Sequence, residues 1–182
     1  TIVAYGRDSN KLLNVAIMGS QTSGAIANSQ LAQLKVVNGT SVPASLNVLL
    51  DGTTAVSGLA FAGVAPYQSV TAGTRTVTVE SSANPGATLL TVTPNLVPAT
   101  DNSIALYGSA GAMAALTLAD TNAPVAVGRA SLRIVSISPD LGSIDVYANF
   151  GKVVSALGPN AASAYSLVDA VIAGTPYRFD VN

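Results

Sequence analysis

The chain has 182 residues with a net charge of −1, and only 9% of its residues are charged, against about 25% in ordinary soluble domains. So little charge protects poorly against self-association, and it leaves no basic surface for a nucleic-acid backbone. With no Cys, no His and no long apolar run, the sequence excludes disulfides, Cys-based zinc sites, Cys or Ser-His-Asp nucleophiles and a membrane-spanning helix.

The residue types favour strands and turns over helices. Thr, Val and Ser are abundant, while strong helix formers are scarce: Glu80 is the only Glu, and Lys occurs only at Lys11, Lys35 and Lys152. Gly and Pro are spread along the chain, where they favour turns. The composition therefore predicts an all-β protein whose core is filled by small aliphatic side chains.

Alternation of apolar and polar residues predicts strands along the chain. It is clear at residues 46–50, which end at Asp51-Gly52, a strong signal for a two-residue hairpin turn. Residues 110–118 have the best helical spacing, but neighbouring glycines and a lack of charge favour a strand or a short turn. Further turns are predicted at Asn38-Gly39, residues 84–86 and Pro139-Asp140, and further strands at residues 74–80 and 144–148.

A comparison of the chain with itself reveals an internal repeat. Residues 34–37 (LKVV) resemble residues 132–135 (LRIV) at an offset of 98, and the same offset carries Tyr67 onto Tyr165. Each copy therefore reads as strand, turn, strand, a strand marked by an aromatic residue, an Ala-Gly-Thr turn and a further strand. The other matches are residues 46–48 with 144–146, residues 72–74 with 173–175 at an offset of 101, and Val77 and Val79 with Phe179 and Val181 at an offset of 102.

A third echo lies at the N-terminus, where residues 1–6 (TIVAYG) resemble residues 103–108 (SIALYG), again at an offset of 102. We therefore expect residues 33–130 to form a complete sandwich unit, residues 1–32 the C-terminal part of one, and residues 131–182 the complementary N-terminal part of another. The expected fold is all-β, with tandem antiparallel β-sandwich units of the immunoglobulin-like kind, one complete and one split between the two chain ends.

The second copy also resembles a known family. Residues 133–140 (RIVSISPD), 144–147 (IDVY) and 173–175 (AGT) are similar to the V-V-H-A-S-P-D, V-D-V-Y and A-G-T segments of a bacterial domain-of-unknown-function family, catalogued as 4397. Ser136 stands where the family has His, and the first copy keeps only Asn47-Val48 of the second segment and lacks S-P-D. The resemblance implies immunoglobulin-like or transthyretin-like sandwiches in exported bacterial proteins, often in tandem, with no established activity.

The carboxylates and lysines do not suggest catalysis. Most Asp residues are expected at turns, where they cap backbone N–H groups. A Ser-Lys dyad needs a buried Lys, whereas Lys11 and Lys152 are expected in polar loops. A calcium site would draw on Asp140 and Asp145, but no D-x-D-x-D-G loop is present, and a turn residue and a solvent-facing strand residue are the simpler interpretations. We therefore expect no enzyme, no cofactor and no metal site.

The six Tyr residues raise the question of a surface for stacking carbohydrate. Tyr67 with Tyr165, and Tyr5 with Tyr107, occupy equivalent positions of the repeat. Equivalent placement favours packing, with each hydroxyl reaching a loop backbone. A carbohydrate or other surface ligand is kept as an alternative.

Half a sandwich cannot stand alone, because its apolar faces and its strand edges would lack partners. We expect residues 131–182 of one chain and residues 1–32 of the next to complete one unit by strand complementation, and this head-to-tail contact does not close, so it builds a filament. Completion within one chain is the other arrangement. The residues expected at the interface are Ile2, Val3, Tyr5, Val15, Ile17, Leu132, Ile134, Ile144, Val146, Tyr165, Phe179 and Val181.

The sequence thus predicts a non-catalytic extracellular structural protein of a bacterium, a filament, pilus-like or surface-polymer subunit whose partners are copies of itself. The alternative is a cell-surface adhesion or ligand-binding module from a longer exported protein with tandem repeats. Both predictions exclude nucleic acid as a partner and a membrane span as an anchor.

Overall fold

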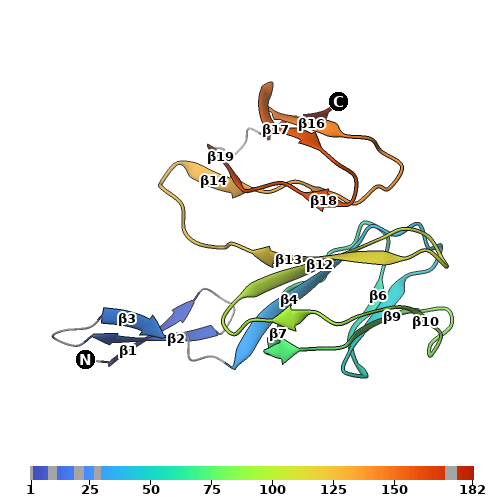
Figure 1. The fold of residues 1–182 in the computed structure, drawn as a ribbon, viewed down its shortest axis with the longest axis horizontal. Coiled ribbons are helices and arrows are strands. Elements are labelled where there is room, and N and C mark those ends of the chain that lie inside the picture. Colours follow the sequence, from blue (N-terminus) through green and yellow to red (C-terminus); the bar gives the residue numbers. More distant parts are fainter. Residues whose placement is uncertain (1, 8–11, 19–22, 27–29, 171–175) are drawn as a thin grey trace. The chain divides into compact units, whose positions relative to one another are not determined.

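The computed structural model describes residues 2–7, 12–18, 23–26, 30–170 and 176–182. Every regular element in these residues is a β-strand, which confirms the all-β prediction (Figure 1). None of them forms a helix long and apolar enough to cross a membrane. The chain divides into two compact units, Thr1–Thr121 and Asn122–Asn182.

The first unit contains the strands β1 to β13. Their bounds are β1 Ile2–Arg7, β2 Leu12–Met18, β3 Ser23–Ile26, β4 Leu31–Asn38, β5 Leu46–Leu50, β6 Thr53–Leu59, β7 Gln68–Thr71, β8 Gly73–Thr74, β9 Val77–Ser81, β10 Thr88–Val92, β11 Asn95–Leu96, β12 Asp101–Tyr107 and β13 Ala114–Asp120.

The second unit contains the strands β14 to β20. Their bounds are β14 Arg129–Leu132, β15 Val135–Ser136, β16 Ile144–Ala148, β17 Gly151–Leu157, β18 Ala161–Ala162, β19 Ser166–Asp169 and β20 Phe179–Val181.

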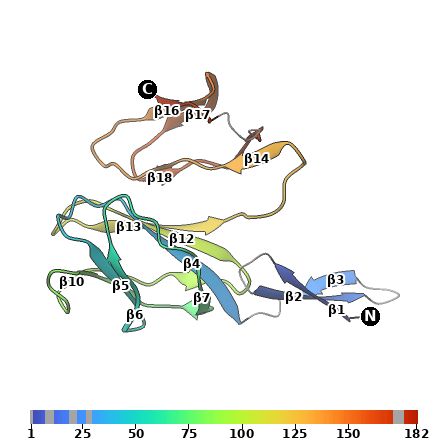
Figure 2. The ribbon, with the colours of Figure 1, turned by 180° about the vertical axis from the view of Figure 1, so that it is seen from behind.

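Two four-stranded sheets form a β-sandwich in the first unit, which confirms the prediction of a β-sandwich (Figures 1 and 2). One sheet has the order β13-β12-β4-β7 and the other the order β10-β9-β5-β6. Neighbouring strands run antiparallel, except that β12 runs parallel to β4. Both sheets supply the core, which includes Leu34, Val36, Ile104 and Leu106 from the first and Leu46, Val48, Val77 and Val79 from the second.

Local sequence explains the hairpin between β5 and β6. The turn residues Asp51 and Gly52 have φ angles of 48° and 81°, the left-handed backbone that this tight turn requires and that Gly and Asp tolerate best. Asp51 also accepts a hydrogen bond from the backbone N–H of Thr76 at 2.9 Å, which fixes the turn to the start of β9. The predicted turn is therefore confirmed, together with the contact that supports it.

Two other predicted segments are refined by the structure. Residues 110–118 contain the start of β13, so the strand interpretation is right and the helical one is wrong. The predicted strand over residues 74–80 is interrupted after Thr74, where β8 ends, and resumes at Val77. The backbone N–H of Arg75 donates to Pro94 in this gap, at 3.0 Å.

The strands β1, β2 and β3 form an antiparallel three-stranded sheet. Ile2 pairs with Ile17 in β1–β2, and Val15 with Ile26 in β2–β3. The five interface residues predicted in this region belong to strands of this sheet: Ile2, Val3 and Tyr5 to β1, and Val15 and Ile17 to β2. Their side chains lie outside the described residues.

The second unit holds three small sheets, β14-β19, β15-β18 and β17-β16-β20. Their pairings repeat those of the sandwich. Arg129 pairs with Asp169 in β14–β19 as Leu31 pairs with Thr71 in β4–β7, and both offsets are 98 (129 − 31 and 169 − 71). The β16–β17 hairpin likewise repeats the β5–β6 hairpin, including both of its register shifts.

The third sheet carries the larger offset found in the sequence. Val146 pairs with Val181 as Val48 pairs with Val79, so that β16 corresponds to β5 at an offset of 98 and β20 to β9 at an offset of 102. The compact units divide after Thr121, whereas the predicted boundaries lie at residues 32/33 and 130/131. That division into one complete and two partial sandwich units stays a prediction.

Candidate functional site

The edge of β14 is the first candidate site. In the sandwich, β4 lies between β12 and β7. In the described part of the second unit, β14 pairs with β19, the counterpart of β7, and with no other strand. Edge strands present backbone N–H and C=O groups that accept a further strand. The edge of β14 is therefore placed where β12 lies in the sandwich.

Two exposed apolar side chains lie on β20 of the second unit. Phe179 and Val181 in β20 are 49% and 57% exposed. Their counterparts in β9, Val77 and Val79, are 0% exposed. Strand β9 lies between β5 and β10, whereas β20 pairs only with β16 among the described strands. The second unit therefore exposes apolar side chains whose counterparts in the first unit lie in the core.

The β1–β2 hairpin has the pairing of the hairpin that completes the sandwich. Ile2 pairs with Ile17 in the antiparallel β1–β2 pair, and Ile104 pairs with Thr117 in the antiparallel β12–β13 pair. The connection is two residues longer in β1–β2, since 17 − 2 is 15 and 117 − 104 is 13. Strand β1 is therefore the counterpart of β12 in both sequence and pairing.

The remaining predicted interface residues are spread over the second unit. Val146 is buried inside the unit's own sheet, where it pairs with Val181. Tyr165 lies just before β19 and is exposed. Leu132 ends β14, Ile134 follows it, and Ile144 begins β16. Their role in an interface between chains stays a prediction.

A polar cluster on the β4–β12–β13 sheet is the second candidate site, and its charged members, Lys35 and Asp120, are not among the site residues predicted from the sequence. The Asp120 carboxylate in β13 accepts hydrogen bonds from the hydroxyl of Tyr67, at 2.5 Å, and from the hydroxyl of Ser103 in β12. The Lys35 Nζ atom of β4 lies 3.9 Å from Asp120 Oδ2 and 4.6 Å from the centroid of the Tyr67 ring. The side chain of Asp120 is 5% exposed and that of Lys35 is 30% exposed.

Strand register explains why these side chains meet. Lys35 is the parallel partner of Ser103, and Asp101 is the antiparallel partner of Asp120. Directly opposite residues share a face, as do residues two apart in one strand, so Asp101, Ser103, Asp120 and Lys35 lie on the same face of the sheet. Asp101 is 2% exposed, which brings a second buried carboxyl group to this face.

Tyr67 departs from the sequence-based expectation for the Tyr hydroxyls, whereas Tyr177 meets it. Tyr67 donates its hydroxyl to a carboxylate instead of a loop backbone, so that expectation is wrong for this residue. The hydroxyl of Tyr177 does donate to a backbone carbonyl, that of Asp169. The pairing of Lys35 with Tyr67 recurs at offset 98, where Arg133 lies 4.7 Å from the ring centroid of Tyr165. This recurrence of a basic residue and a Tyr is the sequence signal that could have pointed to the cluster.

Asp140 and Asp145, the two weak metal candidates, do not form a metal site together. Asp145 Oδ2 pairs with Lys152 Nζ at 2.5 Å, and Asp145 Oδ1 accepts the backbone N–H of Ala156 at 2.8 Å. The hydrogen bond from Lys152 lowers the pKa of Asp145, with the Ala156 N–H as the second cause, and raises that of Lys152. Asp140 lies exposed in the predicted Pro139-Asp140 turn. The described residues contain no cluster of three metal-ligating side chains.

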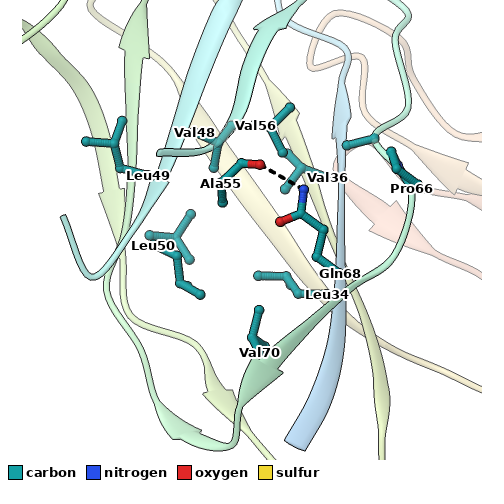
Figure 3. Close-up of a pocket in the computed structure, with 12 residues that line it drawn as sticks. Leu34, Val36, Val48, Leu49, Leu50, Ala55, Val56, Pro66, Gln68 and Val70 are labelled. Atoms are coloured by element: carbon teal, nitrogen blue, oxygen red, sulfur yellow. Dashed lines mark hydrogen bonds between the residues drawn. The ribbon is translucent and has the colours of Figure 1, made fainter. Parts of the chain in front are cut away.

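Cavities among the described residues differ in size and enclosure. Figure 3 shows the apolar space between the two sheets of the sandwich, where Gln68 Nε2 donates to the Ala55 carbonyl at 2.8 Å. This space amounts to ≈ 10 Å³, about the volume that one water needs, so it is a packing gap. An open hollow of ≈ 300 Å³ in the second unit is lined by Arg129 and Asp169, which form an ion pair, among other residues.

Comparison with known proteins gives one family match. The model of the family described as "Domain of unknown function (DUF4397)" matches residues 32–147. No curated protein matches the chain.

Proposed function

This chain belongs to the DUF4397 family, and from its residues and strand pairings we propose that it is a non-catalytic, extracellular structural protein of a bacterium. Its units are completed by strand addition between copies, which join head to tail into a filament or a comparable surface polymer. The observation that carries this proposal is the edge of β14, at the position where β12 lies in the sandwich.

The exposed apolar residues of β20 support strand addition. Burial of Phe179 and Val181 to the extent of their counterparts Val77 and Val79 would remove two large apolar side chains from water. Burial of such a side chain is worth about 1.5–3 kcal/mol. The second unit therefore has an apolar driving force for a partner as well as backbone groups to pair.

The register of the sandwich supplies the register of the proposed contact. Ala105 pairs with Val37 in the parallel β12–β4 pair. The counterpart of Ala105 is Val3 (105 − 102), and that of Val37 is Val135 (37 + 98). Strand β1 of one copy therefore lies parallel to the segment that begins with β14 in the next, with Val3 opposite Val135. The contact is heterologous, so each copy offers both halves and the chain of contacts stays open.

The composition supports an assembly outside the cell without catalysis. The charged fraction of 9% gives little electrostatic resistance to self-association. The lack of His and Cys excludes the nucleophile arrangements that depend on them. An extracellular location rests on the resemblance to exported proteins that the sequence motifs carry.

A second candidate is a surface adhesion module within a longer tandem array. The strand pairings that recur between the two units favour it, because repetition of one pattern of strands is what a tandem array produces.

Mixing two chains that each carry one Cys tests the proposed contact, and the native chain has no Cys to interfere. Chains with Val3→Cys and with Val135→Cys are mixed at micromolar concentration and oxidised. The proposal predicts a disulfide-linked pair of unlike chains, seen on a non-reducing gel and by mass. Tags of different size identify the two partners.

The matched control replaces Val135→Cys by Ile134→Cys. A shift of one residue places the side chain on the opposite face of the strand, so the yield of the unlike pair is expected to fall at least several-fold. Equal yields from both mixtures, or a double variant that closes its disulfide only within one chain, would contradict strand addition between copies.

A further inference from the structure

The cluster around Lys35 and Asp120 joins the first and last strands of the sandwich. Strand β4 opens the two-sheet sandwich and β13 closes it, and both belong to the sheet β13-β12-β4-β7. Lys35 Nζ lies 3.9 Å from Asp120 Oδ2, and both side chains are at least partly withdrawn from water. An amine and a carboxyl group held this close are the two reactants of an amide bond.

The surroundings favour this reaction chemically. The Tyr67 and Ser103 hydroxyls donate to Asp120 Oδ2, the oxygen on which negative charge develops when an amine attacks the carboxyl carbon. The Tyr67 ring lies 4.6 Å from Lys35 Nζ and holds the amine beside its target. Fixed proximity replaces a collision in solution and raises the effective concentration of the two groups by many orders of magnitude.

Asp101 adds a group that can move protons. It is the register partner of Asp120, lies on the same face and is 2% exposed. A carboxyl group in this place can accept a proton from the amine and return it to the departing oxygen. Its relation to Lys35 and Asp120 is set by three paired strands, so the arrangement does not depend on a loop.

We propose that Lys35 and Asp120 form an intramolecular amide bond that ties β4 to β13. Lys35 Nζ attacks Asp120 Cγ, one C–N bond forms and one C–O bond breaks. The Oδ1 oxygen leaves with its bonding electron pair as water, taking two protons from the ammonium group, one of them by way of Asp101. The ion pair holds every atom of the products, so no oxidant, cofactor or second substrate is required.

Burial gives this reaction its driving force. Two charges withdrawn from water bear a desolvation cost that their mutual attraction repays only in part. The amide is neutral, so its formation removes both charges from the face. In the second unit Arg133 stands at the position of Lys35, and a guanidinium group does not form this amide, so the cross-link is specific to the first unit.

The intact mass of the purified chain is the test. The native protein is expected to be lighter than its sequence by one water molecule, and the variants Lys35→Arg and Asp120→Ala to have their full sequence masses. Lys35→Arg keeps the positive charge and copies Arg133, so a folded variant is expected. Asp101→Asn is expected to slow the loss of water at least tenfold in freshly folded protein.

A tryptic map identifies the bond, because Asp51-Gly52 can also lose water by cyclisation of its own backbone. The amide protects Lys35 from trypsin, so residues 12–75 should be recovered joined to residues 76–129. A folded native chain of full sequence mass, cleaved after Lys35, overturns the proposal. Water lost from a peptide that does not contain Lys35 and Asp120 overturns it as well.

Discussion

Single polar residues distinguish the two copies of the repeat. Asn38 is 1% exposed, and its side chain makes three hydrogen bonds: Nδ2 donates to the Leu59 carbonyl, and Oδ1 accepts from the N–H and the hydroxyl of Thr40. Ser136 stands at the same place in the second copy (38 + 98), and its buried hydroxyl has no hydrogen-bond partner among the described residues. The same position is thus satisfied in one copy and unsatisfied in the other.

Asn38→Ala is expected to destabilise the protein by about 2–4 kcal/mol, because it removes three buried hydrogen bonds and leaves the partner groups without a hydrogen bond. Ser136→Ala is its matched control. Removal of a buried hydroxyl without a partner is expected to be neutral or slightly stabilising. Urea unfolding of both variants measures the difference. Equal losses of stability would show that the hydrogen bonds of Asn38 do not stabilise the first copy.

Asp51 is expected to make the free energy of unfolding depend on pH in acid solution. The backbone N–H of Thr76 is the main cause that lowers the pKa of this carboxyl below its usual 3.8, and the hydrogen bond from Arg75 adds to it. A lowered folded-state pKa contributes stability that is present above the unfolded value and is lost as the pH falls through the folded value. The contribution is therefore present at pH values above 3.8 and disappears in more acid solution.

Asp51→Asn tests this pH dependence. In the second copy Asn149 occupies the same position and accepts the equivalent N–H, that of Arg178, at 3.0 Å. The variant is therefore expected to keep the hairpin and to lose less stability than the native chain when the pH falls below 3.8. Unfolding curves at neutral and acid pH measure both slopes, and parallel slopes would exclude Asp51 as a source of the acid sensitivity.

At the scale of elements, the turn between β12 and β13 depends on one glycine. Gly108 has a φ of +90°, and a Cβ atom there would lie 2.3 Å from the carbonyl oxygen of Ala112. Gly111, in the same connection, has a φ of +83° but nothing within 4 Å of a Cβ position. The two glycines share the left-handed backbone and differ in the close contact.

Gly111→Ala is expected to cost about 1–2 kcal/mol for the backbone alone, and Gly108→Ala about 3 kcal/mol or more because the backbone must also shift. Chemical unfolding of the two variants gives the comparison. Equal losses would mean that the hairpin adapts to the added methyl group without strain.

Local patterns predicted much of the secondary structure, since alternation is a property of neighbouring residues. Such patterns predict strands at residues 46–50 and 144–148, and a turn at Asp51-Gly52 after the first of them. The parallel pairing of β12 with β4 joins residues more than sixty positions apart, and alternation carries no information about it. The cluster of Lys35 with Asp120 depends on that pairing, so the sequence alone did not reveal it.

At the scale of the whole molecule, the repeat links sequence to assembly. Strand pairings in the second unit reproduce those of the sandwich at offsets of 98 and 102, which are the offsets of the sequence repeat. Among the described residues, the second unit reproduces the pairings of β4, β5 and β9 and places no strand beside β14 where β12 lies in the sandwich. The proposed polymer fills this position with β1 of another copy, in the register of the sandwich.

The most direct test of strand addition between copies is sedimentation velocity of the native chain over a range of concentrations. An open series of species that grows with concentration is predicted, because each added copy renews the edge of β14. The variant Phe179→Ser/Val181→Ser is expected to shift the series towards monomer, while Phe61→Ser, which removes an aromatic side chain that is 69% exposed in a sandwich loop, should leave it unchanged. A native chain that sediments as a folded monomer throughout, or as a closed dimer, would contradict strand addition between copies.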